Sequence, residues 1–382
     1  MSEQKKNDPA QMAGRRRFLQ IAGFGAAAGL LGGQASQAFA QSCTPPGGDV
    51  MVAPGEAQLH ARTWMAWPAS TSIWGNLLSG IQADVALIAR TIAKYEPVIL
   101  CADGSYNASI ARNKAGSTVT VVSDIPVNDL WARDTACLFR VNAAGTHDAV
   151  GLNFNGWGNK QTYTKDGYVA EGIAYKAGVP FSRADFVSEP GAIEQDGEGT
   201  LIATESSIIN ANRNPGKTKA QLEAAMMAAY GATKVIWVPG VVGQDITDDH
   251  IDATSRFVRP GVVIVQVAPD SNTTVWGIDS RQQFAILSNA TDAKGRKLQV
   301  IKVSPPTNPR VKTPDFLNSY MNFYVCNGAV ITAQFGDVAA DAAAKAALQA
   351  AFPGRVVEML NLDRLYGGGG GVHCSTQQEP IA

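Results

Sequence analysis

The sequence predicts an α/β fold, because helical segments alternate with short β-branched runs along most of the chain. About five amphipathic or alanine-rich segments are each followed within a few residues by a strand-like run, and extra strand-like runs lie between them. Helix starts are spaced by about 50 to 85 residues, without a repeated sequence at that period. This order fits a doubly wound sheet and also a radial array of ββαβ units, and periodicity alone does not choose between them.

The clearest helix is predicted over residues 79–95, where Ile81, Val85, Ile88 and Ile92 recur at helical spacing. Alanine-rich stretches predict two more helices, because alanine has the highest intrinsic helix propensity. The predicted helices after the first cover residues 166–178, 217–230, 280–288 and 339–352.

Strands are predicted where Val, Ile, Thr and aromatic residues gather in short runs. The predicted strands cover residues 97–101, 118–122, 149–154, 201–204, 234–238, 262–267, 298–303 and 356–360. Asn327-Gly328, between residues 323–326 and 329–333, predicts a hairpin, since this dipeptide suits a two-residue turn.

The N-terminal segment resembles a targeting signal rather than part of the fold. Residues 15–20 read Arg-Arg-Arg-Phe-Leu-Gln, a Gly/Ala-rich stretch follows over residues 21–33, and residues 38–40 read Ala-Phe-Ala. The apolar stretch is too short and glycine-rich to span a bilayer, so no stable membrane anchor is expected. We predict a twin-arginine signal over residues 1–40, export by that machinery to the periplasm or beyond, and one catalytic domain over residues 41–382; a basic tail is the alternative.

The composition is that of a globular protein, with 45% hydrophobic and 17% charged residues. Beyond residue 40 the chain carries 27 basic and 31 acidic residues. A mildly acidic body argues against nucleic acid as a partner and is compatible with a cationic substrate.

The five cysteines and four histidines do not predict a metal site or a disulfide framework. No two cysteines form a C-x-x-C pair, and no histidines form H-E-x-x-H or another zinc spacing. We therefore expect no metal and no cofactor.

Five consecutive glycines over residues 367–371 precede Val372, His373 and Cys374. A flexible surface tether is one interpretation, since every glycine increases the entropy lost on folding. The other is a site where the backbone approaches a substrate and Cys374 is the nucleophile. Such a thiol needs a histidine or another cation nearby. His373 need not face it, being its sequence neighbour, so a histidine elsewhere is expected.

Residues 247–252 read Thr-Asp-Asp-His-Ile-Asp. If this segment is a strand, alternation places Asp248, His250 and Asp252 on one face of it. His250 would then be a general acid and base, and Asp252 would bind a cation. The alternative is a polar turn with a capped histidine.

Two further motifs carry candidate site residues. Residues 131–135 read Trp-Ala-Arg-Asp-Thr, which indicates either a polar site around Trp131 and Asp134 or a structural network between Arg133 and Asp134. Glu189 precedes a predicted Pro-Gly turn and either reaches a pocket or is an ordinary turn residue.

Taken in order, these motifs resemble the agmatine deiminase family, which includes the bacterial type of peptidyl-arginine deiminase. The resemblance covers about residues 54–380. The similar stretches are residues 63–68, 131–135, 154–158, 189–194, 196–200, 212–215, 247–252, 256–258, 322–324, 334–337 and 367–378. The departures lie at Ala136-Cys137, Pro190 and Asp249, where the family has Gly-Pro, Gly and Gly.

The resemblance implies a five-bladed pseudo-symmetric α/β propeller of pentein type, which decides between the two architectures. It implies that Cys374 attacks a guanidinium carbon, that His250 is acid and base, and that Glu189 orients His250. Asp134 and Asp252, with Trp131, would bind the substrate.

The expected reaction is hydrolysis of agmatine to N-carbamoylputrescine and ammonia through a covalent thiouronium. The alternative is deimination of arginine in peptides or proteins. An exported guanidine-binding protein without catalysis is less favoured, and the order of motifs disfavours a papain-type peptidase.

Overall fold

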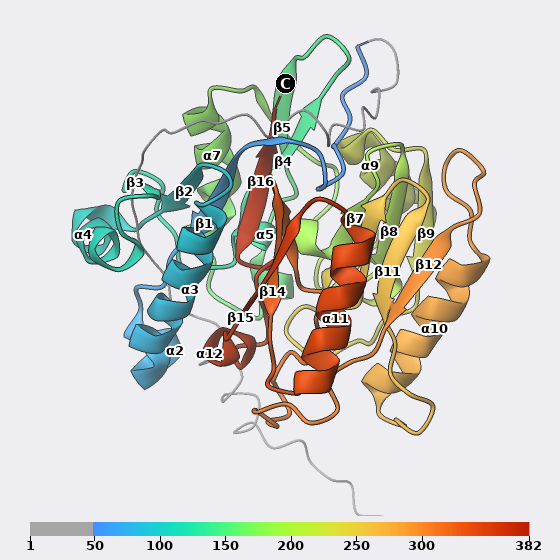
Figure 1. The fold of residues 1–382 in the computed structure, drawn as a ribbon. Coiled ribbons are helices and arrows are strands. Elements are labelled where there is room, and N and C mark those ends of the chain that lie inside the picture. Colours follow the sequence, from blue (N-terminus) through green and yellow to red (C-terminus); the bar gives the residue numbers. More distant parts are fainter. Residues whose placement is uncertain (1–48, 382) are drawn as a thin grey trace, which may run out of the picture.

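In the computed structural model, which describes residues 49–381, five small sheets surround a common centre and the longer helices lie outside them (Figure 1). Four of the sheets share one ββαβ pattern. The first two strands are antiparallel, and the third, reached through a helix, is parallel to the second. These units are β4(Leu138–Val141), β5(His147–Gly151), α7(Val169–Ala177) and β6(Phe181–Arg183); β7(Ile193–Gln195), β8(Thr200–Thr204), α9(Lys219–Tyr230) and β9(Lys234–Val238); β10(Ser255–Arg259), β11(Val262–Gln266), α10(Val275–Asn289) and β12(Gln299–Val303); and β13(Tyr324–Cys326), β14(Ala329–Ala333), α11(Val338–Ala351) and β15(Val356–Leu360).

The fifth sheet closes the ring by joining the two ends of the described chain. It contains β1(His60–Ala66), β2(Val98–Cys101) and β3(Thr120–Val122), with α3(Leu78–Ile92) and α4(Gly104–Ala115) between them. Its first strand is β16(Thr376–Pro380), which runs antiparallel to β1 with Trp64 opposite Gln377. The blade that starts the chain is therefore incomplete without the last strand.

Single helical turns lie in the connections, mostly just before or after a strand, and several carry site residues. They are α2(Thr71–Trp74), η1(Gly75–Leu77), α5(Ala132–Thr135), α6(Gly156–Asn159), η2(Asp166–Tyr168), η3(Pro190–Ala192), α8(Glu205–Ile208), η4(Ile251–Ala253) and α12(Asp363–Tyr366).

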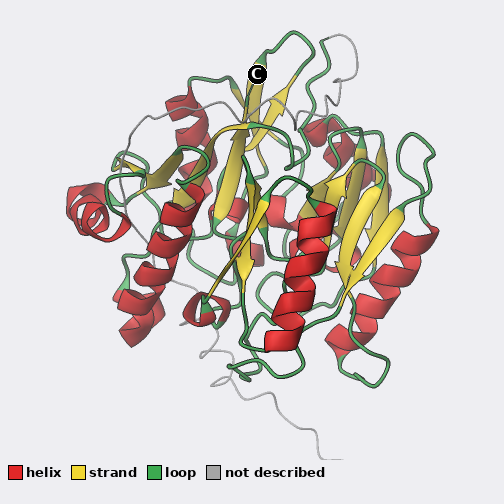
Figure 2. Ribbon diagram, in the orientation of Figure 1, coloured by secondary structure: helices red, strands yellow, loops and turns green. Residues whose placement is uncertain are grey.

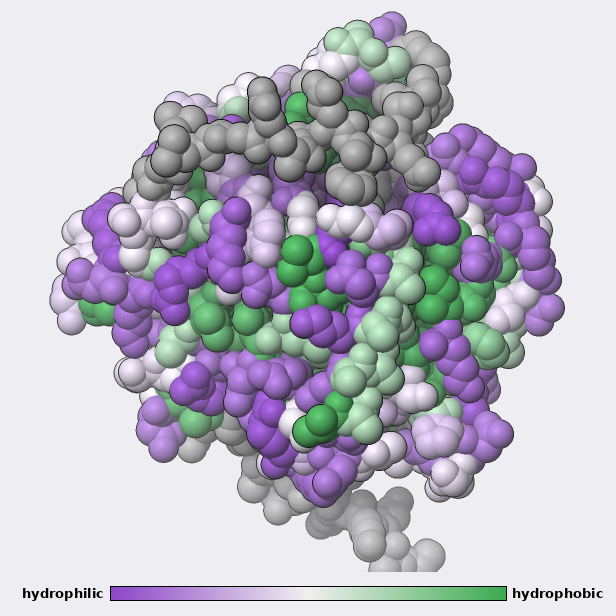
Figure 3. Space-filling view, in the orientation of Figure 1, coloured by the Kyte–Doolittle hydropathy of each residue, from purple (hydrophilic) through white to green (hydrophobic). Residues whose placement is uncertain are grey.

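Local sequence signals explain where the outer helices begin and end. Thr218 and Gln221 form a capping box at the start of α9, and Gly231 ends it in the left-handed conformation with φ of 65°. Asp337 caps α11 by accepting from the Ala340 amide. The alanines of α11 form a weakly hydrophobic band on the surface shown in Figure 3, bordered by hydrophilic side chains.

Hydrophobic side chains fill the spaces between neighbouring sheets and under the helices. One cluster joins Leu138 and Val150 of one sheet to Leu201 of the next, and another joins Ile236 to Val263. The strands lie inside the ring of helices (Figure 2), and many buried charged residues come from the segments at their ends. Apolar burial therefore holds the blades together and leaves a polar centre.

The five predicted helices and the predicted strands are found in the described chain, and the Asn327-Gly328 hairpin is confirmed. Residues 104–115 form a helix that was not predicted. Residues 247–252, predicted as a strand, form a turn that leads into η4. The predicted signal over residues 1–40 lies outside the described residues. Among the described helices, none is long and apolar enough to cross a membrane.

Candidate active site

The candidate site is formed by the segments that lead into the first strand of each blade. Asp134 precedes β4, Glu189 precedes β7, His250 and Asp252 precede β10, Asn322 precedes β13 and Cys374 precedes β16. Each blade thus contributes at least one polar group at the same topological position. This position brings together five sequence-predicted residues that span 240 positions of the chain: Asp134, Glu189, His250, Asp252 and Cys374.

Glu189 is fully buried and holds His250 in place. Its Nε2 lies 3.0 Å from Glu189 Oε2. Arg213 Nε donates to both oxygens of Glu189, at 3.0 and 3.1 Å. Burial opposes ionisation, but Arg213 and His250 together keep the pKa of Glu189 below its usual value. Glu189 is therefore a permanent carboxylate behind the histidine.

The thiol of Cys374 is half-buried and lies between an amide and a carboxylate. Asn322 Nδ2 donates to Cys374 Sγ at 3.1 Å, and Asp252 Oδ2 lies 3.5 Å from Sγ on another side. The backbone carbonyl of Cys374 accepts from the Arg133 amide at 3.1 Å, which ties this segment to α5. Burial, together with Asp252 and Asp134, raises the pKa of the thiol well above its usual value. The cysteine of the free protein is therefore a neutral thiol at neutral pH.

Several buried polar atoms of the site have no hydrogen-bond partner among the described residues: Asp134 Oδ1, Asp252 Oδ1 and His250 Nδ1. Two of them, Asp134 Oδ1 and His250 Nδ1, lie around the position of Gly191 together with Asp252 Oδ2. A Cβ atom there would lie 2.6 Å from Asp134 Oδ1, 3.0 Å from His250 Nδ1 and 3.3 Å from Asp252 Oδ2. Buried carboxylate oxygens need N–H donors, so the site is suited to a ligand that brings several of them.

The charge states of Asp134 and His250 are coupled by their proximity. Asp134 Oδ1 lies 3.7 Å from His250 Nδ1, and its Oδ2 accepts from Trp157 Nε1 at 2.9 Å. Burial raises the pKa of Asp134 to about 7. Burial alone would lower the pKa of His250, but Asp134 and Glu189 raise it to about 9. His250 consequently carries a proton that it can donate at neutral pH.

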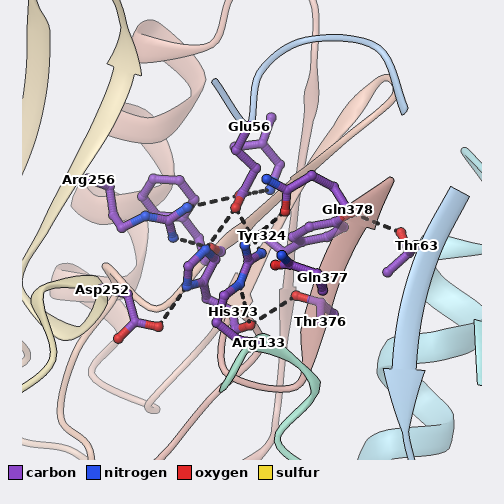
Figure 4. A network of polar contacts seen from close by, with 12 residues as sticks. Glu56, Thr63, Arg133, Asp252, Arg256, Tyr324, His373, Thr376, Gln377 and Gln378 are labelled. Carbon is purple, nitrogen blue, oxygen red and sulfur yellow. Dashed lines mark hydrogen bonds and ion pairs between the residues drawn. The ribbon is translucent and has the colours of Figure 1, made fainter. Parts of the chain in front are cut away.

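The imidazole of His373 lies in a buried ionic network (Figure 4). Its Nδ1 lies 2.7 Å from Asp252 Oδ2, and its Nε2 lies 2.7 Å from Glu56 Oε2. Arg133, which the sequence offered as a partner of Asp134, instead binds Glu56 at 3.0 Å. The structural network around Arg133 therefore exists, but it does not include Asp134.

The glycine run packs against aromatic rings, and its expected approach to the substrate through the backbone stays a prediction. A Cβ at Gly368, Gly370 or Gly371 would collide with the ring of Trp74, Trp131 or Tyr366, respectively. Trp131 is 2% exposed, and no partner of its Nε1 is found among residues 49–381. Its expected contact with substrate stays a prediction.

Asp248 was predicted to share a face with His250 and Asp252, and this is wrong. Asp248 and Asp249 both have positive φ, of 62° and 71°, so the chain does not alternate as a strand does. The carboxylate of Asp248 points to Arg213, at 2.9 Å, and to Lys160, at 2.5 Å. It supports the arginine that holds Glu189.

Four contributors were missed by sequence reasoning: Asn322, Arg213, Glu56 and His373. Asn322 could have been found, because it precedes a first strand as the other site residues do. The contacts of Glu56 and His373 depend on non-local packing and carry no local signal. Within the described residues, no group of three or more His, Cys, Asp or Glu side chains could hold a metal ion.

The fold and the site define a class of protein: a five-bladed α/β propeller whose central cysteine and histidine face two buried carboxylates. The family model for the Porphyromonas-type peptidyl-arginine deiminases matches residues 52–380. This chain therefore belongs to that family.

Its similar proteins include several named for a related activity. The chain is 34% identical over 360 residues to "Agmatine deiminase" of Pseudomonas aeruginosa, covering 88% of this chain and 97% of that one. It is 33% identical over 363 residues to "Agmatine deiminase" of Ectopseudomonas mendocina, with the same coverage. The solved structure of the agmatine deiminase of Enterococcus faecalis superposes with a TM-score of 0.81 at 28% identity, covering 87% of this chain and 96% of that one.

Proposed function

We propose that this protein hydrolyses the guanidinium group of a small cation, most favourably agmatine, with Cys374 as the nucleophile. The observation that carries the proposal is the group of buried polar atoms around Gly191, namely Asp134 Oδ1, His250 Nδ1 and Asp252 Oδ2, of which the first two have no hydrogen-bond partner among residues 49–381. A guanidinium is planar and positively charged and presents N–H groups along its edges.

Binding would satisfy the two carboxylates and prepare the thiol. Asp134 and Asp252 can each accept from an N–H edge of the guanidinium, which holds its carbon in front of Cys374. The bound cation offsets the negative charges that raise the pKa of the thiol. The thiol proton then leaves to solvent, and a thiolate faces the guanidinium carbon.

In the first half-reaction, Cys374 Sγ forms a bond to that carbon, and one C–N electron pair moves onto nitrogen. His250 carries a proton at neutral pH, because the pKa of its imidazole is about 9. It gives this proton to the departing nitrogen, the C–N bond breaks, and ammonia leaves. A thiouronium bound to Cys374 remains.

In the second half-reaction, the now neutral His250 accepts a proton from water as the water oxygen attacks the same carbon. The C–S bond breaks, its electron pair regenerates the thiolate of Cys374, the added hydroxyl group loses its proton to solvent, and a ureido product leaves. Glu189 keeps the imidazole oriented and stabilises its cationic form through the 3.0 Å contact. No metal or organic cofactor enters these steps.

A small substrate is favoured because the site is enclosed. Asp134, His250 and Asp252 are each at most 4% exposed. The named relatives at 33–34% identity are agmatine deiminases. Peptidyl-arginine is the second candidate, since the family model is described by that activity and the predicted export signal would give access to external peptides.

The test is ammonia release by the purified chain from residue 41 with agmatine, arginine and arginine-containing peptides, with Cys374→Ser as the matched inactive control. Faster release from agmatine than from the peptides supports agmatine hydrolysis. Release from peptides alone would transfer the proposal to peptidyl-arginine. Calorimetric binding of agmatine without ammonia from any guanidine would instead indicate a non-catalytic binding protein.

We also propose that the protein reaches the periplasm or the exterior through the twin-arginine pathway. The support is the sequence of residues 15–20, the weakly hydrophobic stretch after it and Ala38-Phe39-Ala40. Replacing Arg15, Arg16 and Arg17 with lysine should leave uncleaved protein in the cytoplasmic fraction. Unchanged export of this variant would contradict the pathway.

A further inference from the structure

His373 lies between two carboxylates, and this geometry fixes its charge. Nδ1 is 2.7 Å from Asp252 Oδ2, and Nε2 is 2.7 Å from Glu56 Oε2 (Figure 4). An ionised carboxylate can only accept hydrogen bonds, so each ring nitrogen must carry a hydrogen. A histidine with hydrogens on both nitrogens is an imidazolium.

Glu56 is well suited to remain ionised at this position. In addition to the contact with His373, the Glu56 oxygens accept hydrogen bonds from Arg133 Nη2 at 3.0 Å and from the Val325 amide at 2.9 Å. Arg256 Nη2 also lies 2.9 Å from this carboxylate. Four donors occupy the acceptor sites of one carboxylate. Burial opposes ionisation of Glu56, but Arg256, His373 and Arg133 hold its pKa well below the usual value.

We propose that His373 is a positioning residue for the reaction, a buried imidazolium that keeps Asp252 ionised and fixes its carboxylate beside Cys374. Oδ2 of Asp252 contacts His373 Nδ1 at 2.7 Å and lies 3.5 Å from Cys374 Sγ, whereas Oδ1 is buried without a hydrogen-bond partner among residues 49–381. This inference rests on the proposed function, because it concerns the carboxylate that would bind the guanidinium. It assigns a role to the histidine beside the nucleophile that is not proton transfer to the substrate.

The two substrate-facing carboxylates differ accordingly. Both are buried, but the hydrogen bond and charge of His373 hold the pKa of Asp252 below its usual value. Asp134 has no such cation in hydrogen-bond contact, and burial raises its pKa to about 7. Asp252 thus stays charged at pH values at which Asp134 has taken up a proton.

The environment of His373 contains charges of both signs. Asp252 and Glu56 touch its ring, and Arg133 Nε approaches its backbone carbonyl at 3.4 Å. The other charged or titratable groups in reach are Arg256 and Glu194, which act through the same network, and Cys374, its sequence neighbour. Removing the imidazolium leaves Asp252 with Arg256 and His250 as the cations that lower its pKa.

The first experiment measures agmatine binding by calorimetry between about pH 5 and 9, in Cys374→Ser to prevent turnover. With His373 present, the association constant should fall below neutral pH with a dependence of about one proton, from Asp134. In Cys374→Ser/His373→Gln, Asp252 should titrate as well, so the dependence should approach about two protons and binding at pH 6 should weaken at least about tenfold more. An unchanged proton dependence would overturn the proposal.

His60→Gln is the matched control in the same network. His60 is also buried and lies between Glu96 Oε1, at 3.0 Å, and the Glu56 carbonyl, at 2.9 Å, without contact to Asp252. This variant should lose stability but keep the one-proton dependence. If it acquired the steeper dependence, the effect of His373→Gln would be structural and the proposal would fail.

The second experiment reads the charge of His373 directly, by ¹⁵N NMR of histidine-labelled protein without substrate. The chain has only four histidines, so single substitutions assign every signal. Both nitrogens of His373 should have the shifts of protonated imidazolium, because each lies 2.7 Å from a carboxylate oxygen. A neutral tautomer would overturn the proposal even if agmatine is hydrolysed. Failure of the proposed function would appear separately, as wild-type protein that releases no ammonia.

Discussion

Two chains of buried side chains meet at the site, each in the order Asp, His, Glu, Arg: Asp134, His250, Glu189 and Arg213 in one, and Asp252, His373, Glu56 and Arg133 in the other. We call them the His250 chain and the His373 chain. They differ at the Asp–His contact. Asp134 Oδ1 and His250 Nδ1 are 3.7 Å apart, whereas Asp252 Oδ2 and His373 Nδ1 are 2.7 Å apart.

This difference separates a reactive histidine from a fixed one. In the His250 chain the 3.7 Å separation leaves an imidazole nitrogen and a carboxylate oxygen without a hydrogen-bond partner among residues 49–381, so a substrate can enter and exchange protons there. In the His373 chain both imidazole nitrogens are occupied by protein atoms. The same residue types therefore serve proton transfer where a contact is open and charge placement where it is closed.

The largest expected effect is loss of proton transfer in His250→Gln. Turnover of agmatine should fall by about 10³-fold, within the range usual for general acid–base catalysis. When His250→Gln is combined with Cys374→Ser to prevent turnover, the double variant should still bind agmatine. Steady-state ammonia release measures the change, with the melting temperature as a check on folding. If His373→Gln reduced turnover more than His250→Gln at pH 8, the assignment of roles would be reversed.

The arginines should differ because their carboxylates are supported differently. Arg213→Met leaves Glu189 and Asp248 without their shared buried cation and should cost about 3 to 5 kcal/mol of unfolding free energy. Arg133→Met should cost less, because Glu56 keeps Arg256, His373 and the Val325 amide. Chemical denaturation of both variants tests the order, and equal losses would contradict it.

The two aspartates should change stability with opposite signs. Burial raises the pKa of Asp134 to about 7, so the folded protein favours the protonated form of this carboxyl group. Its contribution to the stability of the folded protein is present at acid pH and is lost as the pH rises through 7. Asp134→Asn should therefore stabilise the free protein at pH 8, by about 2 to 4 kcal/mol, and have little effect near pH 4.

Asp252 titrates in the other direction. Its pKa is lowered, despite burial, chiefly by His373, so its contribution is present above the usual carboxyl pKa and is lost as the pH falls. Asp252→Asn should destabilise the protein at pH 8. Melting temperatures at pH 5 and pH 8 compare the two variants, and a shift of the same sign in both at pH 8 would contradict the charge assignments.

The smallest expected effect belongs to Asp249, which borders His250 but lies in neither chain. Asp249 has φ of 71° and is 2% exposed, and burial with the nearby Asp279 raises its pKa well above the usual value. Asp249→Gly removes both the left-handed strain and the buried acid, and should stabilise the protein by about 1 kcal/mol. Differential scanning calorimetry measures this, and a lower melting temperature would show that the carboxyl is needed.

Much of the fold could be predicted because its helices and strands have local patterns. The apolar spacing in residues 79–95 and the Asn327-Gly328 turn each correspond to an observed element. The pairing of β1 with β16 could not be derived locally, since its partners are separated by most of the chain. The helix Gly104–Ala115 was missed, having few large apolar residues to make a periodic pattern.

The candidate site shows the same limit. Cys374, His250, Glu189, Asp134 and Asp252 were predicted from their motifs, and the structure places them close together. Strand alternation gave the wrong position for Asp248, because two consecutive residues adopt positive φ. The His373 chain could not be predicted, since Glu56 and His373 are 317 positions apart and meet only in the closed propeller.

The most direct test is mass spectrometry of protein quenched with acid during agmatine turnover. The proposed mechanism predicts a covalent amidine adduct on the peptide that contains Cys374. The adduct should be absent from Cys374→Ser. It should increase in His250→Gln if that substitution slows hydrolysis of the adduct more than attack by the thiolate. Ammonia release without an adduct on Cys374, or undiminished release by Cys374→Ser, would contradict it.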